Sequence, residues 1–209
     1  YTTLFRSSFL LLVGIGAAAL ASPISAILAV IIALAALIYD GIGKHHPLFG
    51  PLNMGICRGF NLLLGVSAVP IAIERWWGLA FVPIAYIAAI TAISRGEVNG
   101  GSKGTGWFAV ALVVAVTLST LALGYLPDYS ILAALPFAIL FAGRVWLPFA
   151  RAAAEPSSDL IRNAVKTGVL SLIILDATIA AGFSGWVYGL LVLSLLLISL
   201  GLARLFAVT

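Results

Sequence analysis

The sequence has very few charged residues. Only 9% of its 209 residues are charged and 63% are hydrophobic, whereas an ordinary water-soluble domain carries about 25% charged residues. So few charges cannot cover the surface of a soluble domain of this length, and a soluble fold is therefore excluded. The useful unit of length is instead the membrane span, which needs about 20 apolar residues to cross a hydrocarbon layer about 30 Å thick.

Cysteine and concentrated positive charge are also scarce. The single cysteine, Cys57, cannot form an internal disulfide. The net charge is +4, but the basic residues are spread over many short segments and form no continuous stripe. We therefore expect a lipid bilayer as the partner and no nucleic acid, with the loop charges setting the orientation in the membrane.

An initiator methionine is missing as well, since the sequence begins at Tyr1. The first hydrophobic stretch ends at Ser22-Pro23 and the second follows at once. That arrangement is typical of a helical hairpin rather than of a cleavable signal peptide. We expect the chain to be partial at its N-terminus.

About eight apolar segments can be recognised, and none alternates with the period of two that a strand requires. Lipid also excludes an open sheet, because its backbone edges would lack hydrogen-bond partners. We predict an all-α, polytopic transmembrane helical bundle with about eight spans, forming a single domain over residues 1–209. The expected spans are 7–21, 24–39, 56–73, 78–94, 106–124, 130–149, 164–182 and 186–206.

The connections between these segments alternate in character. Tight turns are expected at 22–23, 74–77, 126–129 and 183–186, and long polar loops at 40–57, 95–105 and 150–163. Ten of the eleven lysines and arginines lie on or near the long-loop side, and only Arg75 lies opposite. This asymmetry predicts an integral protein of the bacterial inner membrane with the long loops and both termini in the cytoplasm. Arg144 is expected near the cytoplasmic end of its span, where its side chain can snorkel.

The densest polar stretch runs from Tyr39 to Asn61. It contains an acid, two bases, two imidazoles and two amides, and Arg58 and Asn61 lie one helical turn apart. Polar groups at the end of a membrane helix usually face the bundle interior or an aqueous cavity. The stretch therefore either lines a site or forms a solvated cytoplasmic loop.

Within that stretch, the basic residues are better ligand candidates than the imidazoles. His45 and His46 lack any accompanying zinc-site spacing, so we interpret them as interfacial residues. Lys44 and Arg58 are suited to a phosphate or diphosphate, which needs fixed cations.

A second polar stretch covers residues 94–104 and has a single acid, Glu97. Glu97 and Asn99 offer oxygen ligands for Mg²⁺, which often bridges to substrate phosphates. Arg95 and Lys103 would hold a phosphate directly. The alternative is a flexible glycine-rich turn, and the phosphate-loop pattern GxxxxGK[ST] is absent.

Asp176 is the one acid well inside a predicted span. An intramembrane carboxylate is a functional hypothesis by default, and the alternative is a neutral or hydrogen-bonded carboxyl group. Two further patterns indicate structure and not function. Residues 157–159 (SSD) can cap the helix that follows. Gly185 and Gly189 form a GxxxG pair typical of helix packing.

Residues 39–44 (YDGIGK) open a stretch that resembles the UbiA superfamily of intramembrane prenyltransferases. The segment 44–65, KHHPLFGPLNMGICRGFNLLLG, is similar to its EboC-like branch, as is the segment 94–101, SRGEVNGG. The resemblance covers most of the chain. It implies a UbiA-like helical bundle in which Mg²⁺ holds a prenyl diphosphate, whose allylic group is transferred to an aromatic or other lipophilic acceptor.

The resemblance also assigns roles to residues. Catalytic candidates that would orient donor and acceptor are Tyr39, Lys44, Arg58 and Asn61. Diphosphate- or metal-site candidates are Arg95, Glu97, Asn99 and Lys103, with Glu97 the candidate metal ligand. The family's first Asp-rich motif, NDxxDxxxD, would lie upstream of Tyr1, so the chain is expected to lack about two N-terminal helices and that motif.

Two functions from different classes follow. The first is a prenyltransferase that acts on a prenyl diphosphate and a lipophilic acceptor. The second is a non-catalytic membrane carrier or assembly subunit that binds a hydrophobic metabolite, which the single acid of the second motif favours. A secondary transporter would need matching broken helices in two halves, and a CDP-alcohol phosphotransferase would need DxxDGxxAR; neither pattern is present.

Overall fold

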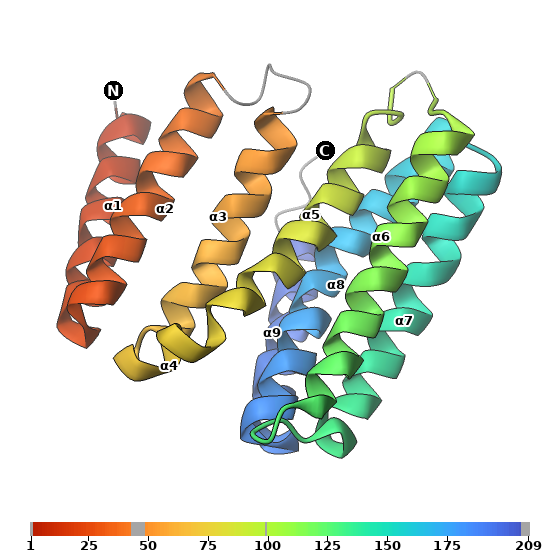
Figure 1. The fold of residues 1–209 in the computed structure, drawn as a ribbon. Helices are drawn as coiled ribbons and strands as arrows, with labels where there is room; N and C mark the ends of the chain where they lie inside the picture. The colour runs from red at the N-terminus through yellow and green to blue at the C-terminus, as the bar shows by residue number, and fades with distance from the viewer. Residues whose placement is uncertain (1, 43–48, 99, 206–209) are drawn as a thin grey trace. The chain divides into compact units, whose positions relative to one another are not determined.

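The computed structural model describes residues 2–42, 49–98 and 100–205 (Figure 1). Throughout these ranges the regular elements are helices, so the predicted all-α fold is confirmed there. They are α1 (Thr2–Ala21), α2 (Pro23–Gly41), α3 (Phe49–Val66), α4 (Pro70–Trp76), η2 (Trp77–Ala80), α5 (Phe81–Ser94), α6 (Lys103–Ala122), η3 (Leu123–Tyr125), α7 (Ile131–Ala154), α8 (Ser158–Ser184) and α9 (Trp186–Leu205).

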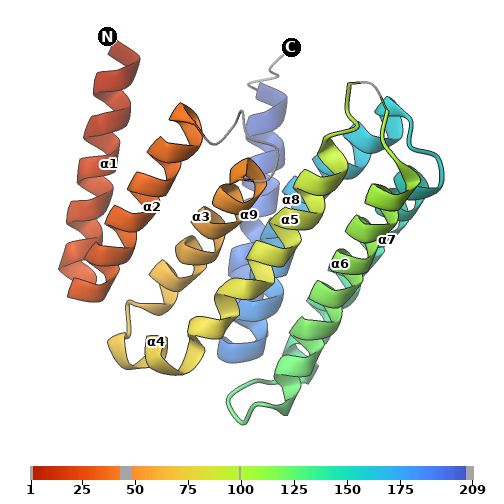
Figure 2. The same ribbon diagram turned by 45° about the horizontal axis from the view of Figure 1, so that its top comes forward.

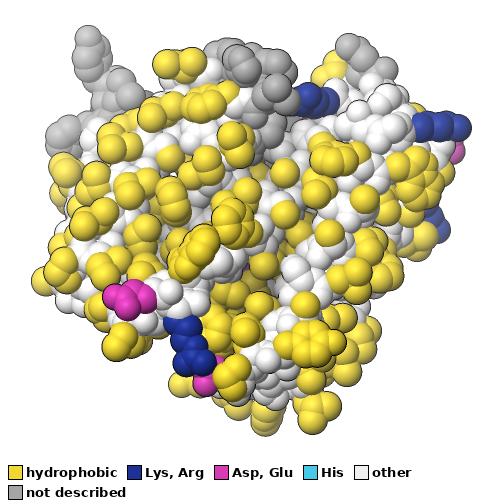
Figure 3. Space-filling view, viewed as in Figure 1, with side chains coloured by type: hydrophobic (Ala, Val, Ile, Leu, Met, Phe, Trp, Pro, Cys, Tyr) yellow, Lys and Arg dark blue, Asp and Glu magenta, His cyan; other side chains and the backbone are white. Residues whose placement is uncertain are grey.

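Five helical stretches of the described chain are long and apolar enough to cross a membrane. They are Pro23–Gly41, Pro70–Ser94, Lys103–Tyr125, Ile131–Ala154 and Ser158–Ser184. Three shorter apolar helices are Ser8–Ala21, Leu52–Val66 and Trp186–Gly201. Hydrophobic side chains are spread over the face seen in Figure 3 and charged ones are few there, as expected for a surface that meets lipid tails. The fold is that of a polytopic helical membrane protein.

Several expected boundaries were wrong. The predicted loop 150–163 is helical up to Ala154 and again from Ser158. The predicted loop 40–57 is helical from Phe49 onward, and the predicted turn at 74–77 lies largely within α4. The polar residue Asn53 is accommodated inside α3 because its side-chain amide donates a hydrogen bond of 2.8 Å to the Ala35 carbonyl of α2. Pro70 begins a new helix because proline lacks an N–H and its fixed φ suits the first helical position.

The chain divides into two compact units, residues 1–88 and 89–209, and α5 runs through the division. In the first, α2 packs against α1 and α3, and α3 packs against η2. Its apolar core centres on Leu28, Leu63 and Ala80.

A buried cluster of three serines ties the start of α2 to the end of α3. The Ser25 hydroxyl lies 2.8 Å from both the Ser22 and the Ser67 hydroxyls. Ser22 also donates to the Ser67 carbonyl at 3.0 Å, and its oxygen caps α2 by accepting from the Ser25 amide. All three side chains are buried, so their polar groups are satisfied by one another within an apolar unit.

In the second unit, α6, α7 and α8 lie side by side, and α8 also packs against α9 (Figure 2). Small residues allow the close approaches: a Cβ on Gly106 would stand 2.6 Å from the Ala153 Cα, and one on Gly189 would stand 2.6 Å from the Ala181 Cβ. The GxxxG interpretation holds for Gly189 only. Gly185 instead makes the turn between α8 and α9, with φ of +90° and open space around it.

Tyr129 anchors the α6–α7 connection to the end of α8. Its ring lies against Gly182, where no side chain would fit, and meets the Phe183 ring edge-on at 5.1 Å. The neighbouring Ser130 amide donates to the Gly182 carbonyl at 2.8 Å. Burial raises the pKa of Tyr129 to about 12, so the phenol stays protonated. Its hydroxyl has no hydrogen-bond partner among the described residues.

We predict that Gly59→Ala destabilises the protein. A Cβ on Gly59 would stand 2.8 Å from an Ile84 side-chain carbon and 2.9 Å from the Ala80 carbonyl oxygen, so the helices must separate, at about 1–3 kcal/mol. Thermal unfolding in detergent should show a lower midpoint. Gly65→Ala on the same helix is the matched control, because nothing lies within 4 Å of its added Cβ, and its midpoint should stay unchanged or rise. Equal effects of the two substitutions would contradict this packing.

Candidate functional site

The loop between α5 and α6 is a compact turn held by its own backbone. The Gly96 and Glu97 amides donate to the Ile93 and Ser94 carbonyls at 3.1 and 3.0 Å, and the Gly100 amide closes the turn on Gly96 at 3.0 Å. Gly100 has φ of +81°, a conformation that favours glycine. Over the part that is described, the predicted polar stretch is therefore a hydrogen-bonded turn.

The α7–α8 connection is attached to this turn. The Gly101 amide donates to the Pro156 carbonyl at 3.1 Å, and the Ser158 hydroxyl lies 3.4 Å from the Val98 carbonyl. Gly96 has no room for a side chain, because a Cβ would stand 2.5 Å from the Ile161 side chain. Ser157 occupies the N-cap position of α8 but its side chain forms no cap bond, so the predicted cap is correct in position only.

The start of α6 is capped on the same loop. The Ser102 oxygen accepts from the Thr105 amide at 3.1 Å and lies 2.8 Å from the Thr105 hydroxyl. Lys103 is the first residue of the helix. The amide end of a helix carries partial positive charge, so Lys103 and the helix end both contribute positive potential that favours an anion.

A pocket of about 230 Å³ lies where these segments meet. Its floor is apolar, formed by buried residues that include Ile93, Ala152 and Ile161, and Arg95 is its one charged lining residue. The lining residues are Ala92, Ile93, Arg95, Gly96, Gly100, Gly101, Ser102, Thr105, Gly106, Ala152, Pro156 and Ile161. An exposed guanidinium above an apolar floor suits an anionic headgroup.

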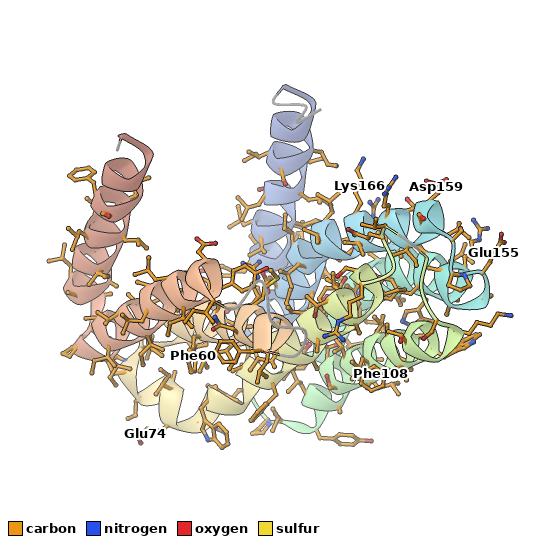
Figure 4. All side chains as sticks on the ribbon, turned by 90° about the horizontal axis from the view of Figure 1, so that it is seen from above. Phe60, Glu74, Phe108, Glu155, Asp159 and Lys166 are labelled. Carbon is orange, nitrogen blue, oxygen red and sulfur yellow. The ribbon has the colours of Figure 1, made fainter. Side chains whose placement is uncertain are left out.

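The other charges of this end of the second unit are mostly solvated. Figure 4 shows Asp159 and Lys166 projecting from the same side of α8. Asp159 pairs with Arg162 at 3.7 Å, with both side chains well exposed, so this pair adds little stability. The mixed charges of the α7–α8 connection therefore act mainly as a solvated surface.

Of the two candidate magnesium ligands, only Glu97 is among the described residues. Mg²⁺ needs oxygen ligands, usually one or two carboxylates together with substrate phosphates. Among the described residues no group of three or more acidic, histidine or cysteine side chains is placed to hold a metal. Glu97 is a single half-buried carboxylate, and Asn99 lies outside the described residues. In the pocket itself, Arg95 is placed to contact a phosphate directly.

The candidates of the first unit are spread along their helices. Tyr39 is half-buried near the C-terminal end of α2, whereas Arg58 is half-buried near the middle of α3. The Asn53–Ala35 hydrogen bond fixes the register of these antiparallel helices, which separates Tyr39 and Arg58 by ~14 Å along the helix axes. Asn61 is exposed one turn beyond Arg58. Lys44, like His45 and His46, lies outside the described residues.

Asp176 lies inside α8, as predicted, eight residues before the helix ends. It is half-buried, as is common for an intramembrane charge that faces protein rather than lipid. The structure places it and the Arg95 pocket in the second unit, and Tyr39, Arg58 and Asn61 in the first.

Sequence reasoning missed several residues that shape the pocket. Ser102 and Thr105 had a detectable signal, because a serine three residues before a threonine at the start of an apolar run is a capping pattern. Pro156 and Ile161 had none, because they reach the pocket only through the tertiary packing of another connection.

No protein-family model matches the chain, and comparisons with curated proteins and with solved structures also give no match.

We predict that Ser102→Ala loosens the wall of the pocket. Loss of a side-chain cap costs about 1 kcal/mol, here concentrated in the first turn of α6. Amide hydrogen exchange at Thr105 and Gly106 should become several-fold faster. Ser102→Thr keeps the hydroxyl acceptor and should preserve the wild-type rates; identical exchange in wild type and Ser102→Ala would show that the cap does not hold this turn.

Proposed function

We propose that the protein is a UbiA-like intramembrane prenyltransferase, which transfers a prenyl group from a prenyl diphosphate to a lipophilic or aromatic acceptor. The observation that carries the proposal is the pocket with Arg95 in its lining at the end of a bundle of membrane helices. A ligand that is anionic at one end and apolar along its length matches that combination. The sequence resemblance to the EboC-like branch supports the same reaction.

The size of the pocket favours a headgroup over a whole substrate. At about 230 Å³ it is smaller than the roughly 300–1,000 Å³ of cavities that enclose complete small ligands. The diphosphate would occupy the pocket, and the hydrocarbon chain would lie against the apolar helices beyond it.

In the proposed reaction, the bond between the allylic carbon and the diphosphate oxygen breaks and the electron pair leaves with the diphosphate. The acceptor supplies the electrons for the new bond and then loses a proton. Arg95 and the amide end of α6 would stabilise the negative charge that grows on the departing diphosphate. The apolar floor would exclude water from the reacting carbon. Mg²⁺, which the resemblance implies, would supply further positive charge to the diphosphate.

A second candidate function is a non-catalytic carrier or assembly subunit that binds a hydrophobic phosphate-bearing metabolite. The absence of a carboxylate from the pocket lining favours it, because the described residues offer no acidic cluster for a metal. The two candidates share the anion pocket and differ in whether the bound diphosphate is released.

Turnover distinguishes them. The purified full-length protein, supplied with Mg²⁺, lipophilic acceptors and a panel of prenyl diphosphates, should release inorganic diphosphate. Arg95→Gln should lower kcat/KM by roughly 10- to 100-fold, because one contact to the developing charge is lost. Arg151→Gln is the matched control, since Arg151 is exposed at the end of α7 and does not line the pocket. If every donor binds saturably and none releases diphosphate, the protein is a carrier and not an enzyme.

We further propose that the long loops face the cytoplasm of a bacterial inner membrane. In a background in which Cys57 is replaced by alanine, Ser157→Cys on the α7–α8 connection should resist a membrane-impermeant maleimide applied to intact cells. Pro127→Cys on the α6–α7 connection, at the opposite end of the second unit, should react. The reverse labelling pattern would invert the proposed topology.

A further inference from the structure

Arg144 lies far inside a membrane helix and is nevertheless exposed. It is ten residues from the end of α7, which places it ~15 Å along the axis from that end. A helix of 24 residues is about 36 Å long and the hydrocarbon layer is about 30 Å thick. Arg144 is thus well within the apolar layer, deeper than the position near the helix end that its expected span implied.

Snorkelling does not readily remove this charge from lipid. Side chains in a helix leave the backbone toward the helix N-terminus. The N-terminus of α7 is the more distant end, thirteen residues away. The Arg144 side chain therefore starts toward the middle of the bilayer. Arg151, three residues from the near end of α7, is placed at the polar interface instead.

The described part of the chain supplies no counter-ion. No described residue forms an ion pair or hydrogen bond with the Arg144 side chain. A guanidinium stays charged at any physiological pH, so it cannot be neutralised by losing a proton. Arg58 and Asp176, which also lie well inside helices, are half-buried, whereas Arg144 is exposed.

The exposed residues around Arg144 would allow another helix to pack against α7. Leu140 and Leu147 lie one turn before and after it, and both are exposed. Gly143 is also exposed, with nothing within 4 Å of the position of a Cβ. A small residue beside a polar one is the combination that lets two membrane helices approach closely and pair their polar groups.

We propose that this outward face of α7, formed by Leu140, Gly143, Arg144 and Leu147, docks a transmembrane helix of another protein that carries a carboxylate at the depth of Arg144. The partner helix needs a carboxylate because the Arg144 guanidinium is positively charged and has no counter-ion among the described residues. A second copy of this chain is a poor occupant, because a two-fold symmetric contact across this face brings Arg144 toward its own copy and the like charges repel.

The probe is a set of synthetic transmembrane helices of leucine and alanine that carry one glutamate, glutamine or leucine near mid-helix. Energy transfer between each labelled peptide and the labelled full-length protein in zwitterionic vesicles measures association. We expect the glutamate peptide to associate at least about tenfold more tightly than the leucine peptide, as for a charge pair in a low dielectric. Arg144→Gln should abolish that preference, and Arg144→Lys should retain most of it.

Arg151→Gln is the matched control and should leave the preference unchanged. A charge exchange guards against a variant that merely misfolds: Arg144→Glu should prefer a lysine-bearing peptide. Equal association of the three peptides, or a glutamate preference that survives Arg144→Gln, overturns the proposal. A different outcome would assign the face to an anionic lipid and would also overturn the proposal. In that case the peptides show no preference, and Arg144→Gln, but not Arg151→Gln, loses bound phosphatidylglycerol.

Discussion

The hydrocarbon layer offers no water to a polar group, and that constraint determines most of this structure. Every backbone N–H and C=O inside it must find a partner in the protein, which only a helix provides within one segment. The same requirement governs the polar side chains. Thr117 and Thr178 donate to the carbonyls one turn earlier in their own helices, and the Trp146 indole donates to the Thr117 hydroxyl. Few buried polar side-chain atoms remain unpaired in the described chain.

Charge follows the same constraint. In the second unit the end that carries the α5–α6 and α7–α8 connections holds Arg95, Lys103 and Arg162. This end also has the pocket, because the two connections cross-link through Gly101 and Pro156 and leave a space that Arg95 lines. The same cations therefore supply both the loop charge that orients a membrane protein and the positive charge at the anion pocket. Arg144 breaks the pattern, which is why it indicates a partner.

Local sequence pattern was sufficient to predict where the apolar helices lie, since a long run without alternation has only one stable form in lipid. It failed where the deciding contact is distant. The start of α3 depends on Asn53 finding the carbonyl of Ala35 on another helix, so a polar stretch read as a loop is helical. The turn at residues 94–104 was recognised as polar, but its order depends on Ile161 and Pro156 from the α7–α8 connection. The depth of Arg144 was misjudged because α7 continues to Ala154, five residues beyond the expected end of the span.

The central claim is that the pocket beside Arg95 recognises the diphosphate of a lipid. Calorimetric titration of the protein in nanodiscs with a prenyl diphosphate and with the corresponding prenyl alcohol tests it most directly, because the two ligands share the hydrocarbon chain and differ only in the anionic end. The account predicts that the diphosphate binds much more tightly than the alcohol and that Arg95→Gln removes most of the difference. Equal affinities for the two ligands, or a difference that Arg95→Gln leaves intact, would contradict it.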